Sequence, residues 1–438
     1  MPQPLKIGVA GLGTVGAALV SLIADQHDAL TARCGRAVDV VAVCARSRGK
    51  DRGINLRKAE WVSDPVALAR DTNVDVFVEL IGGAGNPAKA AVEAALASGK
   101  SVVTANKALL AKHGLALAAL AEKNNAALNF EAAVGGAIPI VRTLREGLAG
   151  NSIERVYGIL NGTCNYILTR MEQEKLSFAD SLKEAQRLGY AEADPAFDIE
   201  GHDTAQKLAI LASLAFSTRV DQSAVYVEGI SSITPADLSA ADELGYRVKL
   251  LGVAVRTQKG IEQRVHPTMV RKDAAIAQVM GVTNAVTVDV AGINPLTLVG
   301  PGAGGMATAS AVLSDIGDIA RCSGPAIAPF GRPTRGLAAV RKAPMQRHEG
   351  GYYIRLLARD KPGTAASIAK RLAQHDISME SIVQRQGKEA AAEIPSGSVP
   401  VILITYATTE DAVRKALAAV GRDRVISGRP QVIRIEKN

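Results

Sequence analysis

Residues 6–16 read KIGVAGLGTVG, and this stretch decides how the first part of the chain folds. A short apolar strand pattern is followed at once by Gly11, Gly13 and Gly16 in the spacing GxGxxG, and then by the helical run AALVSLIA. The first glycine of such a turn permits a tight bend, the second lets backbone approach a pyrophosphate, and the third allows close helix packing. The helix N-terminus favours the phosphate charge. The stretch predicts a dinucleotide site, with a glycine turn that binds no ligand as the alternative.

The pattern that follows predicts an α/β fold. Short apolar runs such as VDVVAVCAR, VDVFVEL and SVVTANK alternate with helical stretches, which is typical of parallel strands joined by helical crossovers. We therefore expect residues 1–130 to form a Rossmann-type dinucleotide-binding domain. A glycine turn opens a further helix over 304–322, which we expect to return to this domain.

The rest of the chain changes character twice. Residues 131–303 mix a Gly-rich turn, helical stretches and strand-like runs, and predict an α+β substrate-binding and dimerisation domain. Residues 323–348 carry four prolines and many basic side chains, as a linker does. Residues 349–438 follow a βαββαβ order, which predicts a ferredoxin-like module.

The choice between NAD and NADP depends on the end of the second strand. An NAD site usually has an acid there to bind the ribose 2′-hydroxyl, whereas this strand ends at Arg46, with Arg48 and Lys50 behind it. Asp39 lies at the beginning of the strand and is poorly placed for that role. We therefore expect NADP, with NAD still open because charges on loops are common.

The composition excludes several function classes. The formal charge is +8, yet the basic residues are scattered and no aromatic stacking pattern accompanies them, so we expect no nucleic-acid partner. No run of about 18 apolar residues predicts a membrane span, and the first residues lack the pattern of an export signal. Four widely separated cysteines form no metal-site or disulfide pattern. We expect a cytoplasmic enzyme.

The catalytic candidates lie in the segment 188–214, which begins LGYAEADPAFDIEGHDTAQKL. On a helical wheel Asp203 and Lys207 share a face with Ile210 and Leu214, and a surface salt bridge is the alternative to a functional pair. Charges on an apolar stripe usually have a function or a partner. A lysine there suits proton donation to a carbonyl that receives a hydride, and Glu192 with Asp203 could hold a substrate ammonium group.

A second candidate lysine, Lys107, follows the strand SVVT. Ligands of open α/β sheets bind at the carboxyl edge of the strands, and this lysine is predicted to lie there. A surface lysine at the start of a helix is the alternative.

Taken together, the blocks GLGTVG, ELIGG, TANKALLAKHG, EAAVGGAIPI, GILNGTCNYIL, LGYAEADPAFDIEGHDTAQKL and GPGAGGMATASAV resemble the successive signatures of homoserine dehydrogenases. They extend from residue 6 to about 322 in the family's order. The resemblance implies reversible reduction of L-aspartate 4-semialdehyde to L-homoserine in threonine, methionine and isoleucine biosynthesis. The pattern departs from the family at Cys164, where Thr is common, and at Asn86, where an acid is usual.

The resemblance also implies roles for individual residues. It makes Lys207 the proton donor, Lys107 its partner, and Glu192 and Asp203 the acids that bind homoserine. Cofactor contacts are implied at Thr14, Val15, Lys107, Gly189 and Gly304. The block EAAVGGAIP is similar to the family's sodium loop, which implies a monovalent cation held by Glu131 and the backbone carbonyls of Val134, Gly136 and Ile138. A tight turn between two domains is the alternative to an ion site there.

The last module, with RLLARDKPGTAASIAKRLAQHDISMESIVQ, is similar to ACT domains. The resemblance implies feedback control by L-threonine and a homodimer or homotetramer; a module kept only for oligomerisation is the alternative. Two other functions stay open. The chain could reduce another amino-acid semialdehyde, or it could be a sensor that kept the fold without turnover, although the presence of both lysines counts against a sensor.

Overall fold

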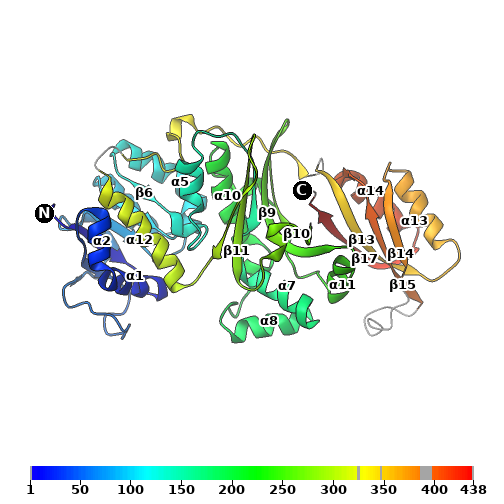
Figure 1. Cartoon of the computed structure of the whole chain (residues 1–438), viewed down its shortest axis with the longest axis horizontal. Coiled ribbons are helices and arrows are strands. Elements are labelled where there is room, and N and C mark those ends of the chain that lie inside the picture. Colours follow the sequence, from blue (N-terminus) through cyan, green and yellow to red (C-terminus); the bar gives the residue numbers. More distant parts are fainter. Residues whose placement is uncertain (1, 323–325, 346–347, 385–396, 437–438) are drawn as a thin grey trace.

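The computed structural model describes residues 2–322, 326–345, 348–384 and 397–436. The chain is elongated, with its N-terminal and C-terminal parts at opposite ends and a set of long strands between them (Figure 1). Parts of the predicted linker and of the last predicted module lie outside the described residues.

The first part is a parallel sheet with the strand order β3-β2-β1-β4-β5-β6. Its bounds are β1 Leu5–Ala10, α1 Thr14–Asp25, α2 His27–Cys34, β2 Val38–Cys44, β3 Glu60–Trp61, α3 Pro65–Arg70, β4 Val76–Glu79, α4 Ala88–Ala97, β5 Ser101–Thr104, α5 Lys107–Lys123 and β6 Leu128–Asn129. The chain order reverses on either side of β1, which makes the end of β1 the topological switch point where such sheets bind ligands. The α/β prediction is confirmed.

Two helices far apart in the sequence cover one face of this sheet. Leu19 and Ile23 of α1 and Val312 and Ile316 of α12 (Gly305–Arg321) pack in one apolar cluster with the strands. Figure 1 shows α12 beside α1, close to the blue N-terminal end of the chain. The apolar stripe of α12 is therefore buried against α1 and the first sheet.

The middle part combines helices with long antiparallel strands. Its bounds are α6 Ile140–Arg142, β7 Ile153–Ile159, α7 Gly162–Glu174, α8 Phe178–Arg187, α9 Ala196–Ile199, α10 His202–Phe216, β8 Tyr226–Val227, α11 Pro235–Glu243, β9 Tyr246–Thr257, β10 Gly260–Arg271, β11 Thr283–Val290 and β12 Leu296–Pro301. The helix α10 is buried along most of its length between α5 and the sheet. That burial explains why its sequence is apolar on more than one face.

The last part has the expected βαββαβ order. Its bounds are β13 Glu349–Arg359, α13 Thr364–Ala373, β14 Met379–Gln384, β15 Ser398–Thr405, the short β16 Thr408–Thr409, α14 Glu410–Arg422 and β17 Ile426–Ile435. We call it the C-terminal module. Its own apolar cluster includes Tyr352, Leu356, Leu403 and Val420.

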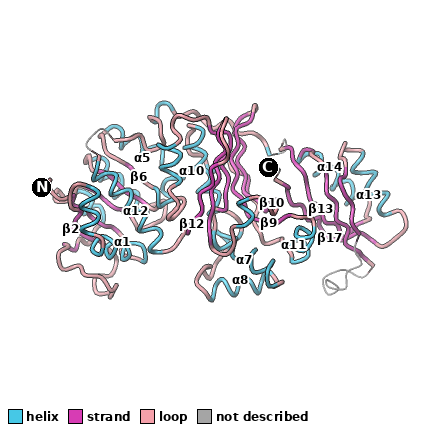
Figure 2. Tube along the Cα trace, viewed as in Figure 1, coloured by secondary structure: helices cyan, strands magenta, loops and turns pink. Residues whose placement is uncertain are grey.

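The strands of the middle part and of the C-terminal module form one continuous sheet, which runs through the middle and right of Figure 2. The order is β12-β11-β7-β9-β10-β17-β13-β15-β14, and β10 and β17 run parallel at the junction. A module that appears appended in the sequence is thus joined to the middle part by main-chain hydrogen bonds.

The predicted linker contributes buried side chains in its described part. Phe330, Leu337 and Ala343 are buried, and the ring of Phe330 lies 5.2 Å from that of Phe130. The hydroxyl and amide of Thr334 donate to Glu122 in α5. Proline and basic residues dominate the composition of this segment, so its few apolar anchors are hard to recognise from sequence.

Candidate functional site

The glycine turn after β1 has the geometry that a pyrophosphate requires. Gly11 has φ +101°, and a Cβ there would lie 2.3 Å from the carbonyl oxygen of Leu80. A Cβ on Gly16 would lie 2.0 Å from the carbonyl oxygen of Gly11, so only glycine lets α1 start this close to β1. A Cβ on Gly13 would meet nothing within 4 Å, which leaves its backbone open on one side. The turn therefore fits a dinucleotide phosphate.

A second helix N-terminus faces the same turn. Gly304, with φ +112°, precedes α12, and a Cβ on the next residue, Gly305, would lie 2.7 Å from Cγ2 of Thr14. Thr14 and Val15 are the first residues of α1. Two helices thus begin side by side, and both direct backbone N–H groups and positive dipole ends to one place. This arrangement brings together four residues predicted to contact the cofactor: Thr14, Val15, Gly16 and Gly304.

The loop after β2 is held in place by Arg52, which was not among the predicted site residues. Arg46 is exposed, as a group that reads a 2′-phosphate would be before binding. Arg52 donates from Nε to the carbonyl of Leu12 at 3.0 Å, and its Nη1 and Nη2 donate to carbonyls at Lys50 and Ser47. It therefore ties the loop that carries Arg46 to the glycine turn. The cluster of basic residues in the segment RSRGKDR was the available signal.

The predicted lysines meet at one carboxylate. Lys207 Nζ lies 2.8 Å from Oδ2 of Asp203, and Lys107 Nζ lies 3.2 Å from Oδ1 of the same residue. Lys207 Nζ also donates to the carbonyl of Leu160 at 2.7 Å. The side chains of Lys207 and Asp203 are 10% and 6% exposed, whereas that of Lys107 is 33% exposed. Polar groups therefore surround the Lys207 ammonium, where the apolar stripe had suggested hydrocarbon.

Asn161, which follows β7 and Leu160, holds the two acids Asp198 and Asp203 in place. Asn161 caps α7 by accepting from the amide of Cys164 at 2.8 Å, and its Nδ2 lies 2.9 Å from both Asp203 Oδ2 and Asp198 Oδ1. Asn161 and Asp198 were missed as site residues. The available signals were an Asn directly after a strand and the density of acids between 192 and 203.

The charges explain how the acids titrate. Burial has the largest effect and by itself raises the pKa of Asp203, but Lys207 and Lys107 outweigh it and lower that pKa to about 2. Burial and the neighbouring Asp203 raise the pKa of Asp198. Burial holds the pKa of the Cys164 thiol well above its usual range, so the cysteine found where the family commonly has Thr is an unreactive core group.

Lys107 is brought to this place by the carboxyl edge of the first sheet. It is the first residue of α5, whose N-cap Asn106 accepts from the amide of Leu109 and donates to the carbonyl of Gly83. Buried Glu79, at the end of β4, accepts from Thr104 and from the amides of Ile81 and Gly82. The edge that carries the glycine turn therefore also carries Lys107, as its position after a strand predicted.

Two predicted residues lie away from this cluster. Glu192 is exposed in the loop between α8 and α9, and in the described part of the chain no hydrogen bond or ion pair joins its side chain to the two lysines. Gly189 is exposed with φ +76° just after α8. Both precede Asp198 in the loop that leads to the cluster.

The Gly-rich turn after β6 uses the side chain of Glu131 structurally. Its two carboxylate oxygens accept from the amides of Val141 and Arg142 at 2.8 Å, so it caps α6. Burial raises the pKa of Glu131 despite these bonds. The backbone carbonyl of Glu131 accepts from the amide of Val134 at 3.3 Å. No backbone amide within the described ranges donates to the carbonyls of Val134 or Gly136, which fits a hard cation.

Two family models match the sequence: "Homoserine dehydrogenase, NAD binding domain" over residues 11–131 and "Homoserine dehydrogenase" over residues 139–316. A homoserine dehydrogenase of Neisseria gonorrhoeae is 44% identical over 95% of this chain and 95% of its own length. The chain belongs to the homoserine dehydrogenase family. The match covers nearly the whole length of both chains.

Solved structures agree with this assignment. The crystal structure of a homoserine dehydrogenase from Thiobacillus denitrificans has a TM-score of 0.92 and 41% identity, and covers 99% of this chain and 98% of that chain. A hyperthermophilic archaeal homoserine dehydrogenase in complex with NADPH has a TM-score of 0.61 and 28% identity, and covers 72% of this chain and 97% of its own. A shorter chain of the same family thus lacks the equivalent of about a quarter of this one.

Family membership makes the chain an oxidoreductase of amino-acid biosynthesis that carries an NAD(P)-binding domain and acts on a small molecule. Among the described residues, no helix combines the length and the apolar character that crossing a membrane requires.

Proposed function

We propose that the chain interconverts L-homoserine and L-aspartate 4-semialdehyde with Lys207 as the proton carrier. The observation that carries this assignment is the geometry of the Lys207 ammonium, which has three N–H donors and directs two of them at Leu160 O and Asp203 Oδ2. The third donor is left for the substrate oxygen. In the reduction Lys207 gives a proton to the carbonyl oxygen, and in the oxidation it takes the hydroxyl proton.

Lys107 completes this arrangement from the cofactor side. Its ammonium shares Asp203 with Lys207 and is partly exposed at the carboxyl edge of the first sheet. The carboxylate therefore holds both cations at a distance at which each can touch a substrate placed between them. A bound nicotinamide cofactor supplies the hydride acceptor or donor at this edge.

The substrate's ammonium group selects amino acids over plain aldehydes. Glu192 and Asp203 are our assigned acids, and Asp198 joins them because it shares Asn161 with Asp203. Asp203 already pairs with two lysines, so the exposed carboxylate of Glu192 is the group that we assign to the substrate ammonium.

NADP is the preferred cofactor in this proposal, with NAD as a poorer substitute. Arg46 lies at the end of β2 and is free to pair with a 2′-phosphate, and Arg52 fixes the loop that carries it. A monovalent cation such as sodium binds the carbonyls of Glu131, Val134, Gly136 and Ile138. The carbonyls of Val134 and Gly136, to which no described backbone amide donates, support that site. The carbonyls of Glu131 and Ile138 also accept from backbone amides.

Regulation belongs to the C-terminal module, which we assign as an ACT domain over residues 349–438. Its βαββαβ order and the DKPG turn that ends at Gly363, with φ +89° before α13, support the assignment. L-Threonine is the proposed effector, and pairing of modules in a homodimer or homotetramer creates its site. Residues 1–130 with α12 bind the cofactor, 131–303 bind the substrate, and 323–348 connect them to the module.

The experiment that tests this function is an absorbance assay of homoserine oxidation with NADP and with NAD, each with and without threonine. We expect turnover with both cofactors, higher catalytic efficiency with NADP, and inhibition by threonine. A panel of other amino-acid semialdehydes run in the reverse direction separates this reaction from a related reductase. Absence of turnover with every substrate would favour a sensor that lost its chemistry.

A further inference from the structure

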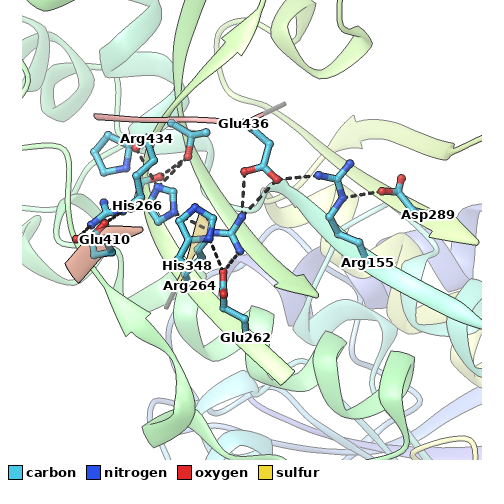
Figure 3. A network of polar contacts seen from close by, with 11 residues as sticks. Arg155, Glu262, Arg264, His266, Asp289, His348, Glu410, Arg434 and Glu436 are labelled. Carbon is cyan, nitrogen blue, oxygen red and sulfur yellow. Dashed lines mark hydrogen bonds and ion pairs between the residues drawn. The ribbon is translucent and has the colours of Figure 1, made fainter. Parts of the chain in front are cut away.

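The junction between the middle part and the C-terminal module contains charged side chains that none of the roles above uses. At this junction β17 pairs with β10 over the residues Thr268–Arg434 and Met269–Ile435. Figure 3 shows Arg434, Glu410 and His266 gathered at one end of a longer network that continues to Arg155 and Asp289. A buried charge is costly unless it is fully paired, so such a network fixes the positions of its members.

Arg434 is the central residue in the part of the network that lies nearest β8. Its side chain is 3% exposed, and it donates from Nε and Nη2 to the two oxygens of Glu410 at 3.0 and 2.8 Å. Its Nη1 donates to Oε2 of Glu228 at 2.8 Å, and its guanidinium lies over the ring of Tyr226. Glu410 belongs to the C-terminal module, whereas Glu228 and Tyr226 belong to the middle part. One buried cation thus joins the two parts.

His266 does not supply a positive charge to this cluster in place of Arg434 or Arg264. It is completely buried, and burial together with Arg434 and Arg264 holds its pKa well below the usual value. Because Arg264 donates from Nε to His266 Nε2 at 3.1 Å, the ring is neutral and carries its proton on Nδ1. The charge opposite Glu228 therefore comes from Arg434.

The short segment Tyr226–Ile230 continues from this cluster toward the active site. The amide of Glu228 donates to Val265 in β10 at 2.8 Å, and the amide of Ile230 donates to the carbonyl of Ile199 at 2.9 Å. Between them Gly229 is packed so tightly that a Cβ would lie 2.4 Å from Ile199 O and 2.6 Å from Glu200 Cα. The segment is in direct main-chain contact with the end of α9.

That end of α9 is the turn that carries the substrate-side acids. Asp198 immediately precedes Ile199, and Gly201, with φ +85°, begins α10 two residues before Asp203. A Cβ on Gly201 would lie 2.9 Å from Cγ1 of Val265, so the turn is confined by β10 as well. A shift of the Tyr226–Ile230 segment would therefore move the turn 198–201.

We propose that Arg434 is a positioning residue for the substrate: through Glu228 and the Tyr226–Ile230 segment it sets the place of the turn 198–201, and hence of Asp198 and Asp203. The C-terminal module then contributes to substrate binding even when no effector is present. This inference rests on the proposed function of the cluster around Lys207, which the experiment tests separately.

The test measures steady-state kinetics of the full-length variants Glu228→Ala, Arg434→Met and Gly229→Ala. We expect the KM for homoserine to rise by about three- to thirtyfold in each, with the KM for NADP unchanged, because displaced coupling residues commonly change binding by such factors. The double variant Glu228→Ala with Arg434→Met should have a homoserine KM no higher than that of the single variant with the higher KM, since the two residues act as one unit. Arg371→Met is the matched control, because it breaks an ion pair with Asp423 inside the module.

The outcomes separate positioning from a purely structural role. A structural role lowers the melting temperature and the active fraction and leaves the homoserine KM of the folded enzyme unchanged, and that result in Glu228→Ala would overturn the proposal. If Arg434→Met does not fold, Glu228→Ala and Gly229→Ala decide, since Glu228 is 30% exposed and Arg434 keeps Glu410 as a partner when Glu228 is truncated. Lys207→Met is assayed beside them. Activity in that variant refutes Lys207 as the proton carrier. An inactive Lys207→Met together with an unchanged homoserine KM in the Glu228, Arg434 and Gly229 variants refutes only this inference.

Discussion

Replacing Lys207 tests the assigned chemistry most directly. The lysine stem is buried beside Leu160 and Asp203, so methionine is the substitution of choice because it keeps the stem and removes only the ammonium. Removing the proton carrier should lower kcat by about two to four powers of ten, the usual contribution of a positioned acid–base group. That loss corresponds to about 2.7–5.5 kcal/mol in the activation barrier.

The same structure predicts what should not change. The glycine turn and the two helix N-termini that fit the cofactor phosphates do not depend on Lys207, so the affinity for NADPH should stay within about twofold of the original. Initial rates of NADP reduction and titration of NADPH fluorescence measure the two quantities. Circular dichroism checks that the variant is folded, because Asp203 keeps only Lys107 and Asn161 as charged or polar partners.

The control is Lys183→Met, which removes a lysine that is 77% exposed and forms a 4.0 Å contact with Asp180. It should behave as the unmodified enzyme. If Lys207→Met kept turnover within about tenfold while remaining folded, the proton would have to come from another group. Lys107 would then be the next residue to replace, since its ammonium lies 3.2 Å from the same carboxylate.

Three further results are expected. Arg46→Asp should shift the ratio of catalytic efficiencies from NADP toward NAD, measured with both cofactors; an unmoved ratio removes Arg46 as the 2′-phosphate reader. Because the pKa of Asp203 is lowered to about 2 in the fold, its ionised form stabilises the protein above pH 4 by on the order of 2 kcal/mol, and this is lost as the pH falls from about 4 toward 2. Acid unfolding of Asp203→Asn should show a weaker dependence on pH in that window, and an identical dependence would contradict the assignment. A chain that ends near Gly324 should melt lower than one that ends at Pro344, because only the longer chain keeps the buried ring of Phe330; equal melting temperatures would mean that this segment adds no stability.

The buried side chains of the segment 326–345 also bear on removal of the C-terminal module. Judged by its prolines and charges, the segment 323–348 offers little apolar surface, and a chain without it and without the module should keep its activity. In the structure Phe330 and Leu337 are buried. Removal of the module also takes Arg434 from Glu228, Glu436 from Arg264 and Arg355 from Asp237. A chain that lacks the module is therefore expected to have a lower melting temperature, so its folding has to be checked before its response to threonine is interpreted.

Much of the fold followed from local patterns. The turn at residues 11–16, the strand–helix alternation to residue 130 and the βαββαβ order after 349 all depend on neighbours in the chain. The α11 helix was missed although its Thr234–Asp237 capping box is readable in the sequence. The shared face of Asp203 and Lys207 was likewise readable, because both lie on one helix one turn apart.

Only the tertiary structure could bring Lys107 to Asp203 or identify Asn161 as the group that holds Asp198 and Asp203. These partners lie on different elements, and no periodicity in the sequence reports a distance between elements. The junction at Arg434 is the extreme case, since Glu228 lies 206 residues away and each side chain alone reads as an ordinary surface charge. The sequence by itself predicted most of the elements and named Lys107, Asp203 and Lys207 as candidates for the chemistry, because hydrophobic period and turn geometry are local. The structure alone decided which charges are buried together, because burial depends on how β17 pairs with β10 and closes one sheet across two parts of the chain.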